Sequence, residues 1–256
     1  MDYEALLTFA TEVGYRLQLS GAETYRIEES VQRLLTAYGA PGGEVFAIPN
    51  LLITSLNAPG GRPLTRIRRI QAHGTDIYRL EALNGLCRRL CAEVPPLDQA
   101  AALLEAVCRD ETQYHRLTLL AGYAVGAGAF TVFFGGGAMD ALCGALCGVV
   151  IGLCLFFMDA LHSNLFFKTF MGSFASALCA VGLVSVGLGQ ALDTIIIGAL
   201  MALVPGLSFT NALRDIIAGD MVSGLSKLAE SLLIGVAIAL GSGVALWLVG
   251  ALGGVL

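Results

Sequence analysis

The chain has 256 residues and a mass of 26.7 kDa, and 56% of its residues are hydrophobic while only 14% are charged. An ordinary soluble domain carries about 25% charged residues, so this composition excludes a purely soluble protein. The net charge of −5 disfavours a nucleic-acid binder, which normally presents a basic surface, and no nucleic-acid partner is expected. The first residues carry acids where a signal peptide would carry basic residues, so no secretory signal is expected.

The charges are unevenly distributed along the chain. Residues 1–116 hold 12 of the 15 Lys and Arg residues and 14 of the 20 Asp and Glu residues. Residues 117–256 keep only three cations and six anions among long apolar runs. This pattern predicts a small cytoplasmic α+β domain over 1–116, followed by a five-helix transmembrane domain over 117–256.

The polar domain is expected to contain four helices and three short strands. Apolar residues recur with the 3.6-residue period of an amphipathic helix at its start, and Gly- and Pro-rich segments separate the later elements. The expected order is helix, helix, three strands, helix, helix, over residues 3–19, 22–38, 45–48, 51–57, 64–70, 77–91 and 97–109.

The polar domain offers little that indicates catalysis. Glu23 and Arg26 stand three residues apart on a predicted helix and form at most a modest surface pair. Glu28 could act as an acid, in a hydrolase that also uses His73 or His115, but no spacing supports that alternative. Neither histidine has a ligand partner at useful spacing, so the sequence predicts no enzyme, no metal site and no cofactor.

The second half of the chain contains five uncharged runs of 18 to 26 residues. A helix needs about 20 apolar residues to cross the hydrocarbon core of a bilayer. Helices are expected because backbone groups in lipid must satisfy their own hydrogen bonds. The predicted spans are about 117–135, 141–158, 168–189, 194–213 and 229–252.

The loop charges predict the orientation of these spans. Arg116, Lys168, Arg214 and Lys227 all fall on one side, and the loops on the other side contain no Lys or Arg. The positive-inside rule then places the polar domain in the cytoplasm and the C-terminus outside. An odd number of spans is unusual for a transporter with internal symmetry, which normally has a matching second half.

The fourth predicted span is interrupted by Pro205 and Gly206, after only 11 uncharged residues. Proline removes a helical hydrogen bond and glycine permits unusual dihedral angles. Transporters often place solute and ion sites at such interruptions, although a simple kink followed by a solvated cytoplasmic loop fits the spacing slightly better. If the interruption is functional, the residues expected to line a polar pathway are Ser208, Thr210, Asn211, Arg214, Asp215, Asp220 and Ser223.

Three segments, taken together and in order, resemble the threonine/serine exporter family. They read GAETYRIE at 21–28, FGGGAMD at 134–140 and PGLSFTNALRDIIAGDMVSG at 205–224. The matching positions are Gly21, Glu23, Thr24, Arg26 and Glu28 in the first, Gly135, Gly136 and Asp140 in the second, and Pro205, Gly206, Asn211, Asp215, Gly219, Asp220, Ser223 and Gly224 in the third.

This resemblance implies an exporter subunit of the bacterial inner membrane that contacts lipid and moves a small polar solute outward. Threonine or serine is the first expectation, and a dicarboxylate such as succinate is the alternative. The family includes long chains with about ten spans and split versions, and this chain resembles the larger split subunit. The resemblance therefore implies a small all-membrane partner subunit or a homo-oligomer.

The resemblance favours the polar-pathway interpretation and suggests roles for individual residues. The interrupted span would offer backbone dipoles to the solute, with contacts from the Thr210 hydroxyl and the Asn211 amide. Arg214 would hold a solute carboxylate, because a planar guanidinium suits bidentate binding. Asp215 or Asp220 would take a proton if export is coupled to proton entry. A channel, or a membrane-anchored scaffold or sensor without transport, remains the rival interpretation.

Overall fold

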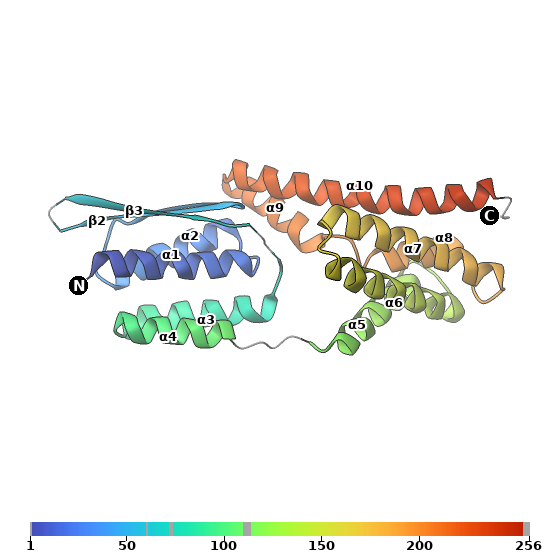
Figure 1. Cartoon of the computed structure of the whole chain (residues 1–256), viewed down its shortest axis with the longest axis horizontal. Helices are drawn as coiled ribbons and strands as arrows, with labels where there is room; N and C mark the ends of the chain where they lie inside the picture. The colour runs from blue at the N-terminus through green and yellow to red at the C-terminus, as the bar shows by residue number, and fades with distance from the viewer. Residues whose placement is uncertain (1, 60, 72–73, 110–113, 253–256) are drawn as a thin grey trace. The chain divides into compact units, whose positions relative to one another are not determined.

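The computed structural model describes residues 2–59, 61–71, 74–109 and 114–252, so His73 lies outside the described residues. The chain divides into two compact units. Figure 1 labels the helices and strands that form them. The N-terminal unit combines residues 1–112 with 208–228, and the membrane unit combines residues 113–207 with 229–256. The N-terminal unit is therefore built from two parts of the chain that are far apart in sequence.

The N-terminal unit has the element order that the sequence predicts. Its three strands form one antiparallel sheet in the order β1-β2-β3. The elements are α1 (Tyr3–Leu19), α2 (Thr24–Ala37), β1 (Glu44–Ile48), β2 (Leu51–Ala58), β3 (Arg62–Arg69), α3 (Ile77–Glu93) and α4 (Leu97–Arg109), followed much later by α9 (Gly206–Ala218) and the first turns of α10 (Met221–Ala251).

Helix α2 owes its position to one apolar stripe. Ile27, Val31 and Leu34 recur at helical spacing and are almost fully buried in the core of the unit. Thr24 lies on the same side at the start of the helix and is only 3% exposed. The stripe therefore directs a hydroxyl group toward the interior, where it needs a hydrogen-bond partner.

Gly21 makes the turn between α1 and α2. Its φ of +85° is in the left-handed region that favours glycine. A Cβ at this position would also lie 2.7 Å from the carbonyl oxygen of Gly74. The first glycine of the 21–28 motif is thus explained by backbone geometry.

The membrane unit is entirely helical in its described residues. It contains α5 (Arg116–Phe133), α6 (Ala138–Ala160), α7 (Leu165–Ser185), α8 (Leu192–Leu200) and most of α10. Four helices, α5, α6, α7 and α10, are long and apolar enough to cross a membrane. The segment expected as one interrupted span over 194–213 falls in two helices, α8 with 9 residues and α9 with 13, on either side of residues 201–205.

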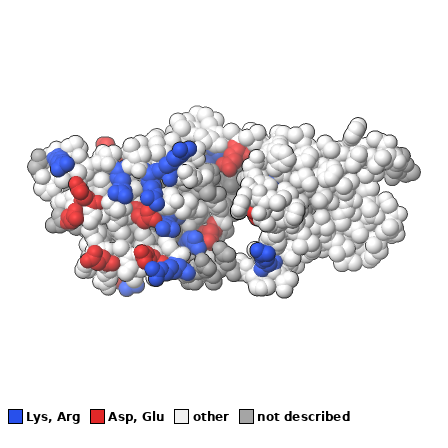
Figure 2. All heavy atoms as spheres, in the orientation of Figure 1, with Lys and Arg blue, Asp and Glu red and all other residues white. Residues whose placement is uncertain are grey.

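The surface of the membrane unit is typical of contact with lipid. On the face shown in Figure 2, charged side chains gather over the N-terminal unit, and the membrane unit is nearly free of them. Large apolar side chains such as Leu153, Phe157 and Trp247 are more than half exposed. Exposed apolar surface of this extent indicates a membrane protein.

Candidate functional site

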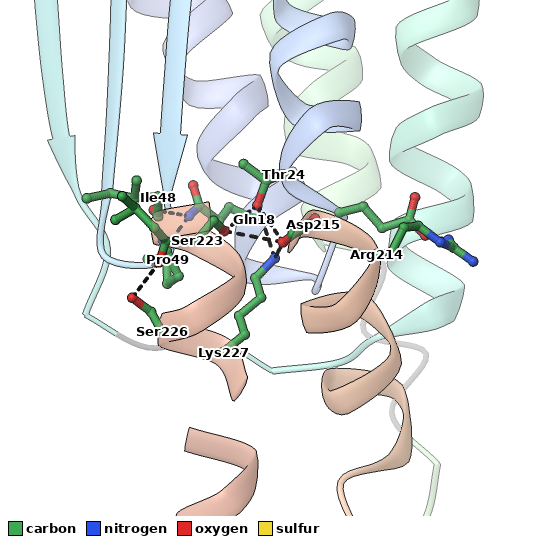
Figure 3. A network of polar contacts seen from close by, with 11 residues as sticks. Gln18, Thr24, Ile48, Pro49, Arg214, Asp215, Ser223, Ser226 and Lys227 are labelled. Atoms are coloured by element: carbon green, nitrogen blue, oxygen red, sulfur yellow. Dashed lines mark hydrogen bonds and ion pairs between the residues drawn. The ribbon is translucent and has the colours of Figure 1, made fainter. Parts of the chain in front are cut away.

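The most buried acidic side chain of the N-terminal unit is Asp215 on α9, which is 0% exposed. Its Oδ2 atom accepts hydrogen bonds from Lys227 Nζ at 2.7 Å, Thr24 Oγ1 at 3.0 Å and Ser223 Oγ at 3.3 Å. The two hydroxyls are 2.6 Å apart, and Lys227 Nζ also donates to Thr24 Oγ1 at 3.1 Å. We call these four residues the Asp215 network (Figure 3).

The network connects two of the three sequence motifs. Thr24 belongs to the 21–28 motif on α2, and Asp215 and Ser223 belong to the 205–224 motif on α9 and α10. All three side chains are at least 97% buried. The structure thus brings together three of the predicted site residues, although 191 positions separate Thr24 from Asp215.

A tight connection between α9 and α10 positions the partners of Asp215. Gly219 has a φ of +100°, and the Asp220 N–H donates to the Asp215 carbonyl at 2.9 Å. A Cβ on Gly224 would lie 2.5 Å from Cγ1 of Ile216, so only glycine allows the two helices to approach this closely. Two glycines of the 205–224 motif therefore have a structural explanation.

One oxygen of the central carboxylate has no partner. Asp215 Oδ1 is buried and accepts no hydrogen bond from any residue that the structure describes. A buried charge is expensive unless it is paired and fully hydrogen-bonded, and here all donors converge on the other oxygen. Such an incompletely satisfied carboxylate is more typical of a functional group than of a stabilising one.

Arg214 does not join the Asp215 network. It forms an ion pair with Glu23, which also pairs with Arg26 Nε at 2.8 Å. In Figure 3 the Arg214 side chain points away from Asp215, and it is half exposed. Two further positions of the 21–28 motif, Glu23 and Arg26, are therefore linked to α9 through charge.

Glu28 lies near the same acidic groups. Burial raises the pKa of its carboxyl group, and the negative charges of Asp220 and Asp215 raise it further. A hydrogen bond from the Ala47 N–H, 2.8 Å from Glu28 Oε1, acts in the opposite direction. Glu28 therefore holds a proton at a higher pH than an ordinary glutamate does.

The remaining positions of the predicted pathway lie outside the network. Ser208 and Thr210 are exposed on α9, and Asn211 is half-buried one helical turn before Asp215. Pro205 and Gly206 stand at the start of α9. Asp220, at the start of α10, is half-buried.

The 134–140 motif builds a loop in the membrane unit. Asp140 Oδ1 accepts from the Gln190 and Ala191 N–H groups at 2.7 and 3.2 Å, and Oδ2 accepts from the Gly137 N–H at 2.9 Å. Gly135 has a φ of +96° in the turn after α5. These contacts give Asp140 a structural role in joining the start of α6 to the connection between α7 and α8.

Sequence reasoning missed Lys227 as a site residue and treated it only as a loop cation. Its signal is spacing, because Ser223 and Lys227 fall at i and i+4 on one face of α10, and Asp220 directly precedes that helix. The Gln18 amide, also labelled in Figure 3, donates to the carbonyl oxygens of Ile48 and Pro49 and has no hydrogen bond to the Asp215 network among the described contacts. In the described ranges, no group of three His, Cys, Asp or Glu side chains could hold a metal ion.

Comparison with known proteins adds a family to this geometry. The family model for threonine/serine exporters (ThrE) matches residues 8–249, nearly the whole chain. The chain belongs to the threonine/serine exporter family. It is 23% identical over 223 residues to a Mycobacterium tuberculosis (strain ATCC 25618 / H37Rv) protein named "Probable threonine/serine exporter", a match that covers 87% of this chain and 42% of the relative.

Two further relatives of this exporter-family chain show the same partial coverage. The "Threonine/serine exporter" of Corynebacterium glutamicum is 24% identical over 249 residues, which is 95% of this chain and 51% of the relative. "Pheromone-regulated membrane protein 10" of Debaryomyces hansenii is 25% identical over 245 residues, 90% of this chain and 24% of the relative. The chain thus spans about half or less of each relative's length, and no solved structure matches it.

Proposed function

We propose that this chain is part of an inner-membrane exporter of threonine and serine, and that the Asp215 network is its coupling site. The observation that carries the proposal is the ion pair of the buried Asp215 with Lys227, 2.7 Å apart, where the 21–28 and 205–224 motifs meet. Membership of the family supports the solute class. Both relatives named as exporters are named for threonine and serine, so we do not retain the dicarboxylate alternative.

Asp215 is the proton acceptor in this proposal. As a carboxylate it holds the Lys227 ammonium and the hydroxyls of Thr24 and Ser223 through one oxygen. A proton on its free Oδ1 removes the charge that retains Lys227, and the link between α2 and the α9–α10 connection weakens. We prefer Asp215 to Asp220 for this role because Asp215 is fully buried and Asp220 is half-buried.

The solute contacts in this proposal lie on α9. Thr210 and Asn211 offer a hydroxyl and an amide, and the first turn of the helix after Gly206 offers backbone N–H groups. Arg214 releases Glu23, its partner in the present structure, and binds the solute carboxylate in its place. Each of these groups matches part of a hydroxylated amino acid, which carries a carboxylate, an ammonium and a hydroxyl.

We also propose five membrane crossings, the fourth of which comprises α8 and the interruption at residues 201–205 and ends at the start of α9. The N-terminal unit is then cytoplasmic and the C-terminus outside, in agreement with the Lys and Arg pattern of the loops. The 31 residues of α10 span about 46 Å, longer than the roughly 30 Å hydrocarbon core. Ser223 and Lys227, near its start, can therefore lie at the cytoplasmic boundary.

Reporter fusions test this topology. Alkaline phosphatase, which folds only outside the cytoplasm, should be active when fused after residue 136 or 190 and inactive after residue 163. An active fusion after residue 163 would contradict the proposed orientation.

We propose that a second membrane component completes the transporter, either a small all-membrane subunit or another copy of this chain. The length of the chain supports this second component, because the chain covers only 42% and 51% of the two relatives named as exporters. Mild-detergent purification of the tagged chain from its native host should yield a complex heavier than one chain. A strictly monomeric chain that exports alone would contradict this part of the proposal.

The decisive experiment measures efflux of threonine, serine and succinate from native-host cells loaded with precursors of each. Deletion of the chain should abolish threonine and serine efflux, and re-expression should restore it. Asp215→Asn should lower efflux more than tenfold, while Asp159→Asn, which removes an exposed partner of Lys168, serves as the matched control. Unchanged efflux on deletion would overturn the exporter proposal and favour the scaffold or sensor alternative.

A further inference from the structure

A cavity of about 640 Å³ lies between α2 and α3 in the N-terminal unit, and its lining includes none of the four residues of the Asp215 network. Its wall includes three arginines, Arg26 and Arg33 from α2 and Arg88 from α3. Tyr25 and Asn84 add an aromatic ring and an amide. Binding sites for small molecules typically enclose about 300–1,000 Å³ and combine apolar surface with a few such polar groups.

The charge of this cavity is positive and only partly compensated. Arg33 pairs with Glu29 at 2.6 Å, and Arg26 pairs with Glu23 at 2.8 Å. Arg88 forms no ion pair with any residue in the part of the chain that the structure describes. Arg88 is thus a guanidinium in a concave wall with unused hydrogen-bond donors, which suits a carboxylate or phosphate oxygen.

The two cysteines of the cavity do not cancel this charge. Burial raises the pKa of the Cys87 thiol to about 12, and burial also raises the pKa of the Cys91 thiol. Both thiols are therefore neutral near pH 7 and contribute apolar surface to the wall. Glu29 is the one acid among the residues that line the cavity.

We propose that this cavity binds an organic phosphate of nucleotide size. Arg88, whose charge no described residue compensates, holds phosphate oxygens together with Arg33, which pairs with Glu29 in the present structure. The Tyr25 ring packs against the base, and the Asn84 amide donates to and accepts from its edge. A four-carbon dicarboxylate would leave most of the 640 Å³ and the aromatic ring unused.

The cavity is connected to the export machinery through one helix and one chain of charges. Tyr25 and Arg26 follow Thr24 directly on α2, and Glu23 lies between Arg26 and Arg214 in the ion pairs already described. A bound phosphate that attracts Arg26 breaks the ion pair between Arg26 and Glu23. Glu23 then pairs with Arg214 alone, and this second ion pair becomes stronger. This link, which rests on the proposed function, makes the bound phosphate an inhibitor of export.

Binding is tested directly on the full chain in detergent by isothermal titration with ATP, pyrophosphate and succinate. ATP should bind most tightly, and Arg88→Ala should weaken it about tenfold or more, since a charge-assisted hydrogen bond is lost. Arg89→Ala is the matched control, because Arg89 is adjacent on α3 but pairs with Glu93 and does not line the cavity. Arg88 is exposed, so its loss should leave the thermal unfolding temperature unchanged.

Three results would overturn the proposal: no ATP binding at millimolar concentration, tighter binding of succinate or pyrophosphate than of ATP, or equal weakening by the Arg88 and Arg89 variants. A separate transport arm adds ATP to the side of the N-terminal unit in proteoliposomes that hold the purified transporter. Slower threonine efflux, relieved by Arg88→Ala, supports the link to export. ATP binding without any effect on efflux refutes that link alone, and ATP binding in a chain without efflux refutes the proposed function alone.

Discussion

Replacing Lys227 by methionine isolates the cost of the buried charge at Asp215. The two charged atoms are 2.7 Å apart, which corresponds to about 6 kcal/mol of attraction at an effective dielectric constant near 20. Desolvation offsets part of this attraction, but removal of the lysine leaves a fully buried carboxylate without its cation. We therefore expect Lys227→Met to lower the free energy of unfolding by about 3–5 kcal/mol.

Replacing Asp215 should lower the free energy of unfolding less than replacing Lys227 does. Asp215→Asn removes the carboxylate and leaves the lysine, whose side chain is 20% exposed and can reach water. We expect this variant to lose about 1–3 kcal/mol, mainly through weaker hydrogen bonds from Thr24 and Ser223. The double variant should be more stable than Lys227→Met alone, because it no longer contains an uncompensated buried charge.

Denaturant titration of the four proteins in one detergent measures this cycle, with unfolding followed by far-ultraviolet circular dichroism. Lys227→Met should have the lowest midpoint of the four, and the second substitution should raise it. If the single lysine variant costs less than about 1 kcal/mol, or the double variant is the least stable, Asp215 is not a buried anion held by Lys227. That result would also remove the basis for treating Asp215 as the proton acceptor.

Three other substitutions test separate features by thermal or denaturant unfolding. The pKa of Glu28 is raised, so its contribution to stability is lost as pH rises through that pKa. The Glu28→Gln variant should therefore match the parent in free energy of unfolding near pH 4 and exceed it at pH 7–8. The same difference in free energy at both pH values would contradict this reasoning. Gly241→Ala should destabilise by about 1–3 kcal/mol because its Cβ would meet a facing helix backbone, whereas Gly243→Ala has open space and should not. Asp140→Asn should cost about 1–3 kcal/mol, since its amide would face backbone donors, and should leave efflux per folded molecule unchanged.

The sequence predicts local structure well because periodicity and turn chemistry are local properties. The stripe of Ile27, Val31 and Leu34 and the stops at Gly39 and Pro95 place the N-terminal helices and strands in the correct order. In the N-terminal unit, helix ends differ from the predicted ones by one or two residues, as at Thr24, where the sequence predicts a start at residue 22, whereas α10 begins at Met221 and not at the predicted residue 229. The apolar runs likewise locate four helices of membrane-spanning length.

The site could be predicted only in part, because it depends on contacts between distant segments. Sequence spacing identifies Asp215 and Ser223 as candidates, and the family resemblance adds Thr24. No local pattern shows that Thr24 meets Asp215, or that Glu23 rather than a solute holds Arg214 in this structure. The same limit hides Lys227, whose role becomes visible only when α10 packs on α9 through Gly224.

The discontinuity of the N-terminal unit has a consequence for biosynthesis. The ribosome completes residues 1–112 long before residues 208–228. Asp215, the hydrogen-bond partner of the Thr24 hydroxyl, is synthesised 191 positions after Thr24. At about 5–20 residues per second, this interval lasts roughly 10–40 s, during which the intervening helices are synthesised. Until then the nascent unit lacks the segment that buries Thr24. The interior of the N-terminal unit is therefore complete only after the chain has been synthesised into α10.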